Sequence, residues 1–206
     1  MLKHFPSFFT CCTKLIFLTL LGVINHPLSA QVGKDGASTL TTDAVLNAYT
    51  KVVADASVGD TLIQVMNVLE LDDLEYGDLV LIIQMQGASI NSATTRSWGE
   101  VSSLNNAGNY EFAYVQGVDQ AANRIEFCSP LTQDYTASGN VQVVQVPQYT
   151  SFTVNPGITL SPQGWNGITG GVVAIHASGT VTIEEASMLV AGDVEDIHLP
   201  LLIRML

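Results

Sequence analysis

The sequence predicts an all-β protein, in which a small β-barrel or sandwich over residues 43–148 is followed by the first coils of a parallel β-helix over residues 149–196. Two observations predict this class. Short runs of strand-forming residues recur between turn signals, and they lack the 3.6-residue apolar period of a helix. After Pro147 the runs become shorter and meet at tight corners, which is typical of a solenoid whose coils stack on one another.

The first block contains six short strand-like runs, a number typical of a small barrel or sandwich. The run 79–85 (LVLIIQM) follows a Tyr-Gly-Asp turn and is apolar on both faces, which predicts a central strand. Residues 88–109 are rich in Ser, Thr, Asn and Gly and predict a long loop, and loops of this length are usually functional or disordered. The other runs cover residues 49–54, 61–68, 110–118, 124–128 and 141–146.

The second block repeats a pair of short strands around a tight corner, first at residues 152–160 and again at residues 181–190, with the strand 172–177 between them. This pattern shows about one and a half coils, whereas a solenoid normally needs three or more repeats to bury its core. Residues 197–206 then form an atypical apolar tail. We therefore expect that the native product is longer and that this chain is a fragment or carries a shifted reading frame near its end.

Residues 1–30 have the pattern of a signal peptide. Basic residues precede an apolar core at 15–24, and Leu28-Ser29-Ala30 provides small residues for cleavage near Ala30. The apolar core is too short to span a bilayer as a helix, although a signal anchor is the rival interpretation. The sequence thus predicts a secreted or cell-surface protein without a membrane span in its mature chain. Residues 31–42, polar and glycine-containing, predict a flexible leader.

Acidic residues dominate the chain, with 19 Asp and Glu against 7 Lys and Arg and a net charge of −12. Such a surface disfavours nucleic acid as a partner, because that binding depends on basic side chains that neutralise phosphates. Cleavage near Ala30 leaves Cys128 as the single cysteine, so the mature chain forms no internal disulfide. Cys128 lies in a strand-like run, which predicts a buried small apolar residue and not a nucleophile.

Two groups of residues are candidates for binding. Asp72, Asp73 and Asp78 lie in an acidic stretch that could bind Ca²⁺ through carboxylate oxygens, although a solvated acidic loop is the favoured explanation. Trp98 and Trp165 lie in predicted loops, where an indole either stacks on a sugar ring or anchors the loop to the body of the protein. The sequence predicts no cofactor other than this calcium ion.

Catalytic residues cannot be assigned from the sequence. His176 lies in a predicted strand, where a structural role is the simpler explanation. Glu184 and Glu185 are adjacent and would point to opposite faces of a strand, so they cannot flank one glycosidic bond. The stretch 151–196 contains no Lys or Arg that could abstract a proton in a lyase reaction. We therefore expect that the chain is not an enzyme.

Five segments carry a family resemblance: NAYTKVVADASVGDT, YGDLVLIIQMQGASIN, NNAGNYEFAYVQGV, VQVVQVPQYTSFTV and WNGITGGVVAIHASGTVTI. Together they resemble the N-terminal region of large secreted surface proteins of gliding Bacteroidota-type bacteria, which are cargo of a type IX secretion route. The resemblance covers residues 45–183. It implies export, gliding-motility-associated or adhesin-like relatives, and surface glycans or other cell-surface proteins as partners.

The resulting functional hypothesis is a non-catalytic, exported structural or adhesive module of a bacterial cell-surface protein. Two alternatives remain open. One is a glycan-binding module that uses Trp98 and Trp165, and the other is the non-catalytic front end of a polysaccharide-degrading β-helix enzyme. The chain departs from the family pattern where glycine-rich β-helix sequence would continue, since it runs into GDVEDIHLPLLIRML and shows no sorting domain.

Overall fold

A computed structural model describes residues 33–183 and 201–205 of the chain. The chain divides into two units, Met1–Ala30 and Gln31–Leu206, and all of the structure presented below belongs to the second unit. The predicted signal peptide, Glu184 and Glu185 lie outside the described residues. Within the described residues the fold is all-β, and its helical segments are single 3₁₀ turns, η1 (Val68–Glu70) and η2 (Ala137–Gly139).

Six antiparallel strands form the first structural part, and their sheet closes on itself. The order is β2-β9-β4-β7-β8-β3. The two outer strands then meet, because the Val53 N–H donates to the Gln64 carbonyl (2.9 Å) and the Met66 N–H donates to the Lys51 carbonyl (2.8 Å). Of the two predicted forms, the structure is therefore the barrel and not the sandwich. The strands are β2 (Tyr49–Lys51), β3 (Leu62–Gln64), β4 (Leu79–Gln84), β7 (Tyr110–Asp119), β8 (Arg124–Phe127) and β9 (Val141–Val146).

Strand β4 is buried on both faces, as its sequence predicts. Val80 and Ile82 point into the barrel core, whereas Leu79, Leu81 and Ile83 join a separate apolar cluster on the outer face of the sheet. That outer cluster also contains residues from the second part of the structure, so β4 lies between two hydrophobic cores. Its continuous apolar run follows from this position.

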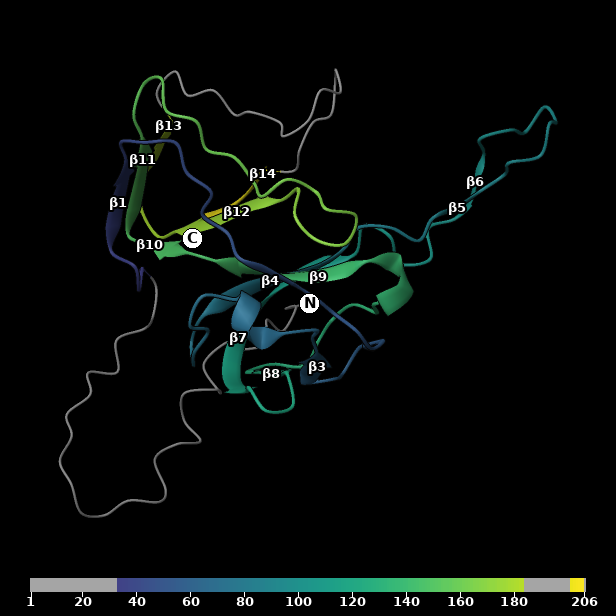
Figure 1. The fold of residues 1–206 in the computed structure, drawn as a ribbon, viewed down its shortest axis with the longest axis horizontal. Coiled ribbons are helices and arrows are strands. Elements are labelled where there is room, and N and C mark those ends of the chain that lie inside the picture. The colour runs from purple at the N-terminus through teal and green to yellow at the C-terminus, as the bar shows by residue number, and fades with distance from the viewer. Residues whose placement is uncertain (1–32, 184–200, 206) are drawn as a thin grey trace, which may run out of the picture. The chain divides into compact units, whose positions relative to one another are not determined.

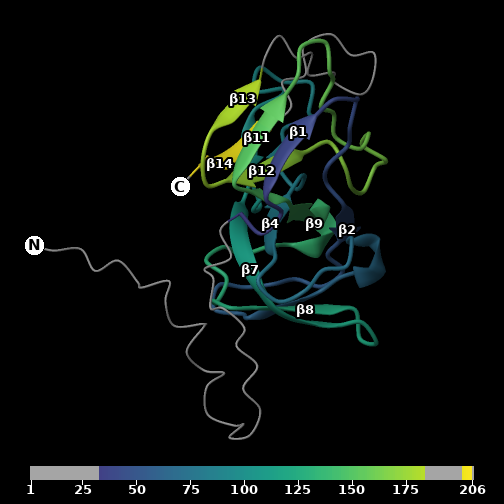
Figure 2. The same ribbon diagram turned by 90° about the vertical axis from the view of Figure 1, so that its left-hand side faces the viewer.

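The second part is a parallel β-helix with two sheets of three strands (Figures 1 and 2). Tyr149 and Phe152 stack in its core with ring centroids 5.0 Å apart, beside the buried Val173 and Ile175. The predicted start of a parallel β-helix is thus confirmed. One sheet contains β1 (Ala37–Leu40), β11 (Ser151–Val154) and β13 (Val181–Ile183); the other contains β10 (Gln148–Tyr149), β12 (Val173–Ala177) and β14 (Leu201–Met205).

The solenoid begins earlier in the chain than predicted. Ala37–Leu40 pairs in parallel register with Ser151–Val154, and Ala44 forms a parallel bridge with Leu160. The prediction of a flexible leader over 31–42 was therefore wrong for this strand. Its pairing partner lies far away in the sequence, so no local pattern marks it as a strand. The barrel is an insertion between the first and second coils of the solenoid.

The far end of the sequence also differs from expectation. Leu201–Met205, within the predicted atypical tail 197–206, forms β14 and pairs in parallel with Val173–Ala177. β1 is the third strand of one solenoid sheet and β14 is the third strand of the other, so each sheet has three parallel strands. The sequence pattern alone shows only about one and a half coils. Three rungs bury the middle strand of each sheet between neighbours, which is the arrangement a solenoid core requires.

Buried amide side chains join the barrel to the solenoid. Asn47 donates to the Ala174 carbonyl (2.7 Å) and accepts from the Ala174 N–H (3.1 Å). Gln142, on β9, forms the same pair of bonds with Gly170, donating to its carbonyl (3.0 Å) and accepting from its N–H (2.8 Å). Both amides are buried. Because each amide satisfies a donor and an acceptor of the solenoid backbone, the two parts are fixed in one relative position.

Candidate functional site

The predicted loop 88–109 is a two-stranded arm that projects away from the barrel (Figure 1). Its strands β5 (Ser89–Ile90) and β6 (Val101–Ser103) are antiparallel. Beyond them the chain turns back through paired backbone bonds between Asn91 and residues 99–100, at 2.7 and 2.8 Å. The arm leaves the barrel at the end of β4 and returns at the start of β7.

A buried glutamine fixes the base of the arm. The amide nitrogen of Gln84 donates to the carbonyls of Gln86 and Asn105, both at 2.8 Å, and its amide oxygen accepts from the Thr136 N–H at 2.8 Å. Gly139 lies against this amide with no room for a Cβ. The arm is therefore held at its root by the barrel, and the extended part is presented from a fixed origin.

The arm presents apolar side chains to solvent. Trp98, near its tip, is 71% exposed. Exposed apolar side chains gathered on one projecting segment make that segment a candidate interaction surface. Arg96 is exposed two residues earlier, and no carboxylate among the described residues lies within ion-pair distance of it. The other exposed apolar residues of the arm are Ile90, Val101 and Leu104.

Trp165 lies on a different element from Trp98, in the loop between β11 and β12, and is 38% exposed. The same loop forms one wall of a cleft of about 440 Å³, whose other wall is the barrel. Lys51 and Glu70 are the charged residues of this cleft, and its remaining lining is mostly amide, hydroxyl and aliphatic groups. The uncharged lining residues are Asn47, Ala48, Tyr49, Met66, Gln163, Asn166, Ile168 and Thr169.

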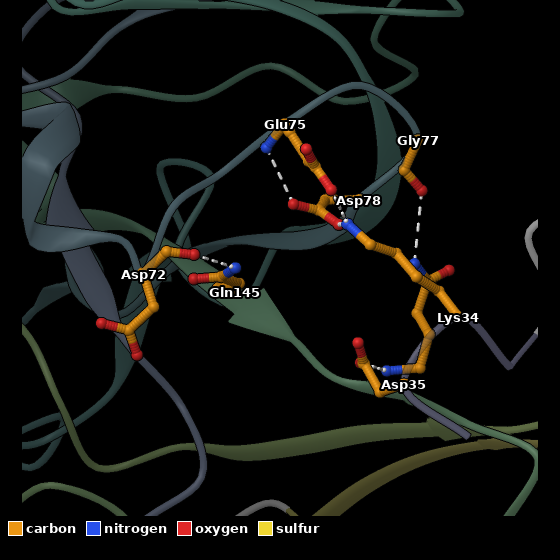
Figure 3. Close-up of polar contacts among 8 residues, drawn as sticks. Lys34, Asp35, Asp72, Glu75, Gly77, Asp78 and Gln145 are labelled. Carbon is orange, nitrogen blue, oxygen red and sulfur yellow. Dashed lines mark hydrogen bonds and ion pairs between the residues drawn. The ribbon is translucent and has the colours of Figure 1, made fainter.

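The three aspartates predicted to bind calcium do not form one site. The Asp78 carboxylate accepts from the Lys34 ammonium (2.5 Å) and from the Glu75 N–H (2.8 Å). The Asp72 side chain points away from Asp78, and its backbone carbonyl accepts from the Gln145 amide at 2.8 Å (Figure 3). Among residues 33–183, no group of three or more His, Cys, Asp or Glu side chains could hold a metal ion.

Lys34 replaces the predicted cation at this turn. Burial alone would lower the pKa of its ammonium, but hydrogen bonds to Asp78 and Glu75 outweigh burial and leave the pKa raised. The Lys34 hydrogen bond in turn lowers the pKa of Glu75. Local sequence patterns do not reveal this ion pair, because Lys34 lies just before β1 in the segment predicted to be a flexible leader.

The remaining candidate residues have structural positions. His176 is fully buried on β12, in register with Gln148 of β10. Cys128 is partly exposed, in contrast to the predicted buried position, and its thiol lies 3.7 Å from the Val115 carbonyl. Tyr49, at the back of the cleft, donates to the Val172 carbonyl (2.5 Å), and burial raises its pKa to about 12.

The search for related proteins returned no family model and no curated protein that matches the chain. No helix among the described residues has the length and apolar character needed to cross a membrane.

Comparison with solved structures gives distant likenesses. The chain resembles tailspike gp61 of Pseudomonas phage phi297 (12% identity, TM-score 0.34) and the gp54 tailspike of Acinetobacter baumannii bacteriophage AP22, solved in complex with capsular saccharide (11%, 0.34). In both cases the match covers 73% of this chain and 25% of the tailspike. The siderophore-interacting protein SipS from Aeromonas hydrophila gives 11% identity and a TM-score of 0.25, over 78% of this chain and 67% of that one. The chain thus spans about a quarter of the tailspikes that it matches, and likenesses of this size transfer no function to it.

Proposed function

We propose that this chain is a non-catalytic, exported structural or adhesive module of a bacterial cell-surface protein, and that the β5–β6 arm is its binding element. One observation carries the proposal: Trp98 is 71% exposed at the tip of an arm whose root is fixed by a buried amide. An exposed apolar side chain costs solubility, so its presence at the end of a built projection favours a contact with another molecule.

The construction of the arm fits a binding role in a second way. Gln84, 1% exposed, connects the arm to the barrel through three hydrogen bonds. A root that is ordered before binding lowers the entropy lost when a partner docks. Tryptophan is also among the side chains that are enriched at positions that dominate binding energy. The partner classes that we propose are surface glycans and other cell-surface proteins.

Adhesion of coated beads tests the proposal. Beads carrying the full chain should bind intact cells of a gliding Bacteroidota-type bacterium, and Trp98→Ala should reduce the bound fraction about tenfold or more. Leu62→Ala is the matched control, because Leu62 is an apolar residue of the barrel with 47% exposure and lies off the arm. Equal adhesion by a folded Trp98→Ala variant and the wild type would remove the arm from the proposal.

A second candidate function is glycan binding in the cleft beside Trp165. The observation that favours it is the lining of this 440 Å³ cleft, where amide groups and aliphatic side chains lie together with Lys51 and Glu70. Sugars present hydroxyl groups and apolar C–H faces to such a surface. On a glycan array, Trp165→Ala and Gln163→Ala should reduce the signal if the cleft binds, whereas Trp98→Ala should not.

The non-catalytic part of the proposal has its own test. Incubation of the chain with acidic and neutral polysaccharides should release no new reducing ends and no unsaturated sugar products. Release of either product by the purified chain, but not by a folded His176→Ala variant, would contradict the non-catalytic proposal. That pair of results would assign a catalytic role to His176.

A further inference from the structure

A second feature of the barrel is complementary to the arm. A hollow of about 170 Å³ opens beside η1, and polar groups make up most of its accessible lining. Leu69, which is 70% exposed, provides an apolar side chain within this lining. Asp72 and Asp73 also line the hollow, and both are exposed. An exposed leucine beside two carboxylates fits a partner that carries an apolar side chain and a cation close together.

The arm carries that combination at its tip. Trp98 is 71% exposed, and the exposed Arg96 lies two residues before it. No described carboxylate pairs with Arg96, and no described cation pairs with Asp72 or Asp73.

The arm and the hollow lie at opposite ends of the same strands. β7 starts at Tyr110, where the arm returns to the barrel, and ends at Asp119, next to the hollow residues Val118 and Gln120. A strand of ten residues, as β7 is, spans about 30 Å at roughly 3.3 Å per residue. β4 runs the other way, from the turn after Asp73 to the arm root at Gln84. Because the arm projects away from the barrel (Figure 1), it does not reach its own hollow.

We propose that the arm of one copy docks into the Asp72–Asp73 hollow of a second copy. This inference rests on the proposed function, in which the arm is the binding element, and it names the partner as another molecule of the same chain. In the docked pair Trp98 packs on Leu69 in the hollow, and Arg96 lies against the carboxylates of Asp72 and Asp73.

The geometry determines the kind of assembly. The two contacting surfaces are different, so the contact is heterologous, and each added copy leaves one arm and one hollow free. Such contacts build a linear chain of copies unless the rotation between them closes a ring. A contact made by a single arm buries little surface, so the affinity of each arm–hollow contact should be low. At a crowded surface, several such contacts together would hold the copies more tightly.

Sedimentation velocity of the full chain tests the docking. The wild-type sedimentation coefficient should rise with protein concentration, and the rise should shrink at high salt because Arg96 faces carboxylates. Two double variants should associate with themselves at least tenfold more weakly than the wild type, and should therefore stay monomeric at the concentrations where the wild type associates. The arm variant combines Arg96→Glu with Trp98→Ala, and the hollow variant combines Asp72→Lys with Asp73→Lys. The wild type remaining monomeric at every concentration would overturn the inference.

A mixing experiment is the decisive form of this test. The arm variant keeps its hollow and the hollow variant keeps its arm, so an equal mixture should form dimers that do not grow further. A mixture that stays monomeric, although both variants have wild-type circular dichroism and melting temperature, would overturn the docking. Leu69→Lys provides a second hollow variant at an exposed site, and it should also be monomeric alone and dimeric with the arm variant.

Glu100 provides the control on the arm itself. It is exposed and lies two residues beyond Trp98, so Glu100→Gln removes a charge that the carboxylates of Asp72 and Asp73 repel. This variant should associate as well as the wild type or better, and weaker association would contradict the proposed charge pairing. If the wild type does not self-associate but Trp98→Ala still abolishes adhesion to cells, the proposed function stands and self-docking falls.

Discussion

Replacement of Gln142 by leucine tests how the barrel is fixed to the solenoid. Gln142 is fully buried, and its amide forms two hydrogen bonds with the backbone of Gly170, at 3.0 and 2.8 Å. Leucine has a similar size but cannot form either bond. The N–H and the carbonyl of Gly170 would then both lose their side-chain partner at a buried position.

The expected cost follows from those two groups. A buried donor or acceptor left without a partner costs about 1–3 kcal/mol, so two groups cost about 2–6 kcal/mol. The Gly170 loop also lines the open cleft, from which water can reach the freed groups, so the lower half of the range applies, about 2–4 kcal/mol. For a protein of this size each kcal/mol lowers the melting temperature by about 2–4 °C.

The assay is thermal and urea unfolding of the full chain, with amide hydrogen exchange of the loop 161–171 as a local readout. Gln145→Leu on the same strand is the matched control, because Gln145 is only partly buried and its amide nitrogen forms one bond, to the Asp72 carbonyl. Gln142→Leu should be clearly less stable than Gln145→Leu and should exchange faster in the loop. Equal stability of the two variants would refute the clamp role of Gln142.

Three further outcomes are expected. Lys34→Met should lower the free energy of unfolding by about 1 kcal/mol, in full between about pH 4.5 and 10.5, as measured by urea titration. The lowered Glu75 pKa gives stability that is lost as pH falls below 4.5 through the folded value. The raised Lys34 pKa gives stability that is lost as pH rises above 10.5 through the folded value, so the difference between variant and wild type should disappear at both extremes. Gly139→Ala should cost about 1–3 kcal/mol, because its Cβ would collide with the Gln84 amide at the arm root, and melting curves would show this. Tyr49→Phe should lose less stability than the wild type when pH rises above 10, because burial raises the Tyr49 pKa to about 12 and folding then opposes its ionisation, and unfolding at high pH measures this.

The local sequence pattern was sufficient to predict those strands whose burial is visible in their own run of residues. The apolar run of β4 predicted a strand buried on both faces, and its two sides do face two different cores. The tight corners after Pro147 predicted the solenoid. The exposed position of Trp98 also follows from the polar stretch around it, although that stretch gives no sign of a projecting arm.

Contacts between distant segments were not predictable from such patterns. Ala37–Leu40 is a polar stretch that becomes a strand because β11 pairs with it. The glutamines of β9 look like solvent-facing residues of an alternating strand, yet Gln142 bonds to a loop backbone in a buried position. Asp78 appeared to be a calcium ligand because Lys34, its partner in space, is 44 residues away in the sequence.

The position of the barrel between two solenoid coils sets an order of events in folding. Ala37 pairs with Ser151, so 114 residues (151 minus 37) must be spanned before the first rung can form. Closing so long a flexible loop is entropically costly and slow. A folded barrel removes most of that cost, because the Gln145 N–H donates to the Ala48 carbonyl at 2.9 Å and so brings the two ends of the insertion together. We therefore expect the barrel to form first, with the first strand of the solenoid unpaired until the barrel is complete.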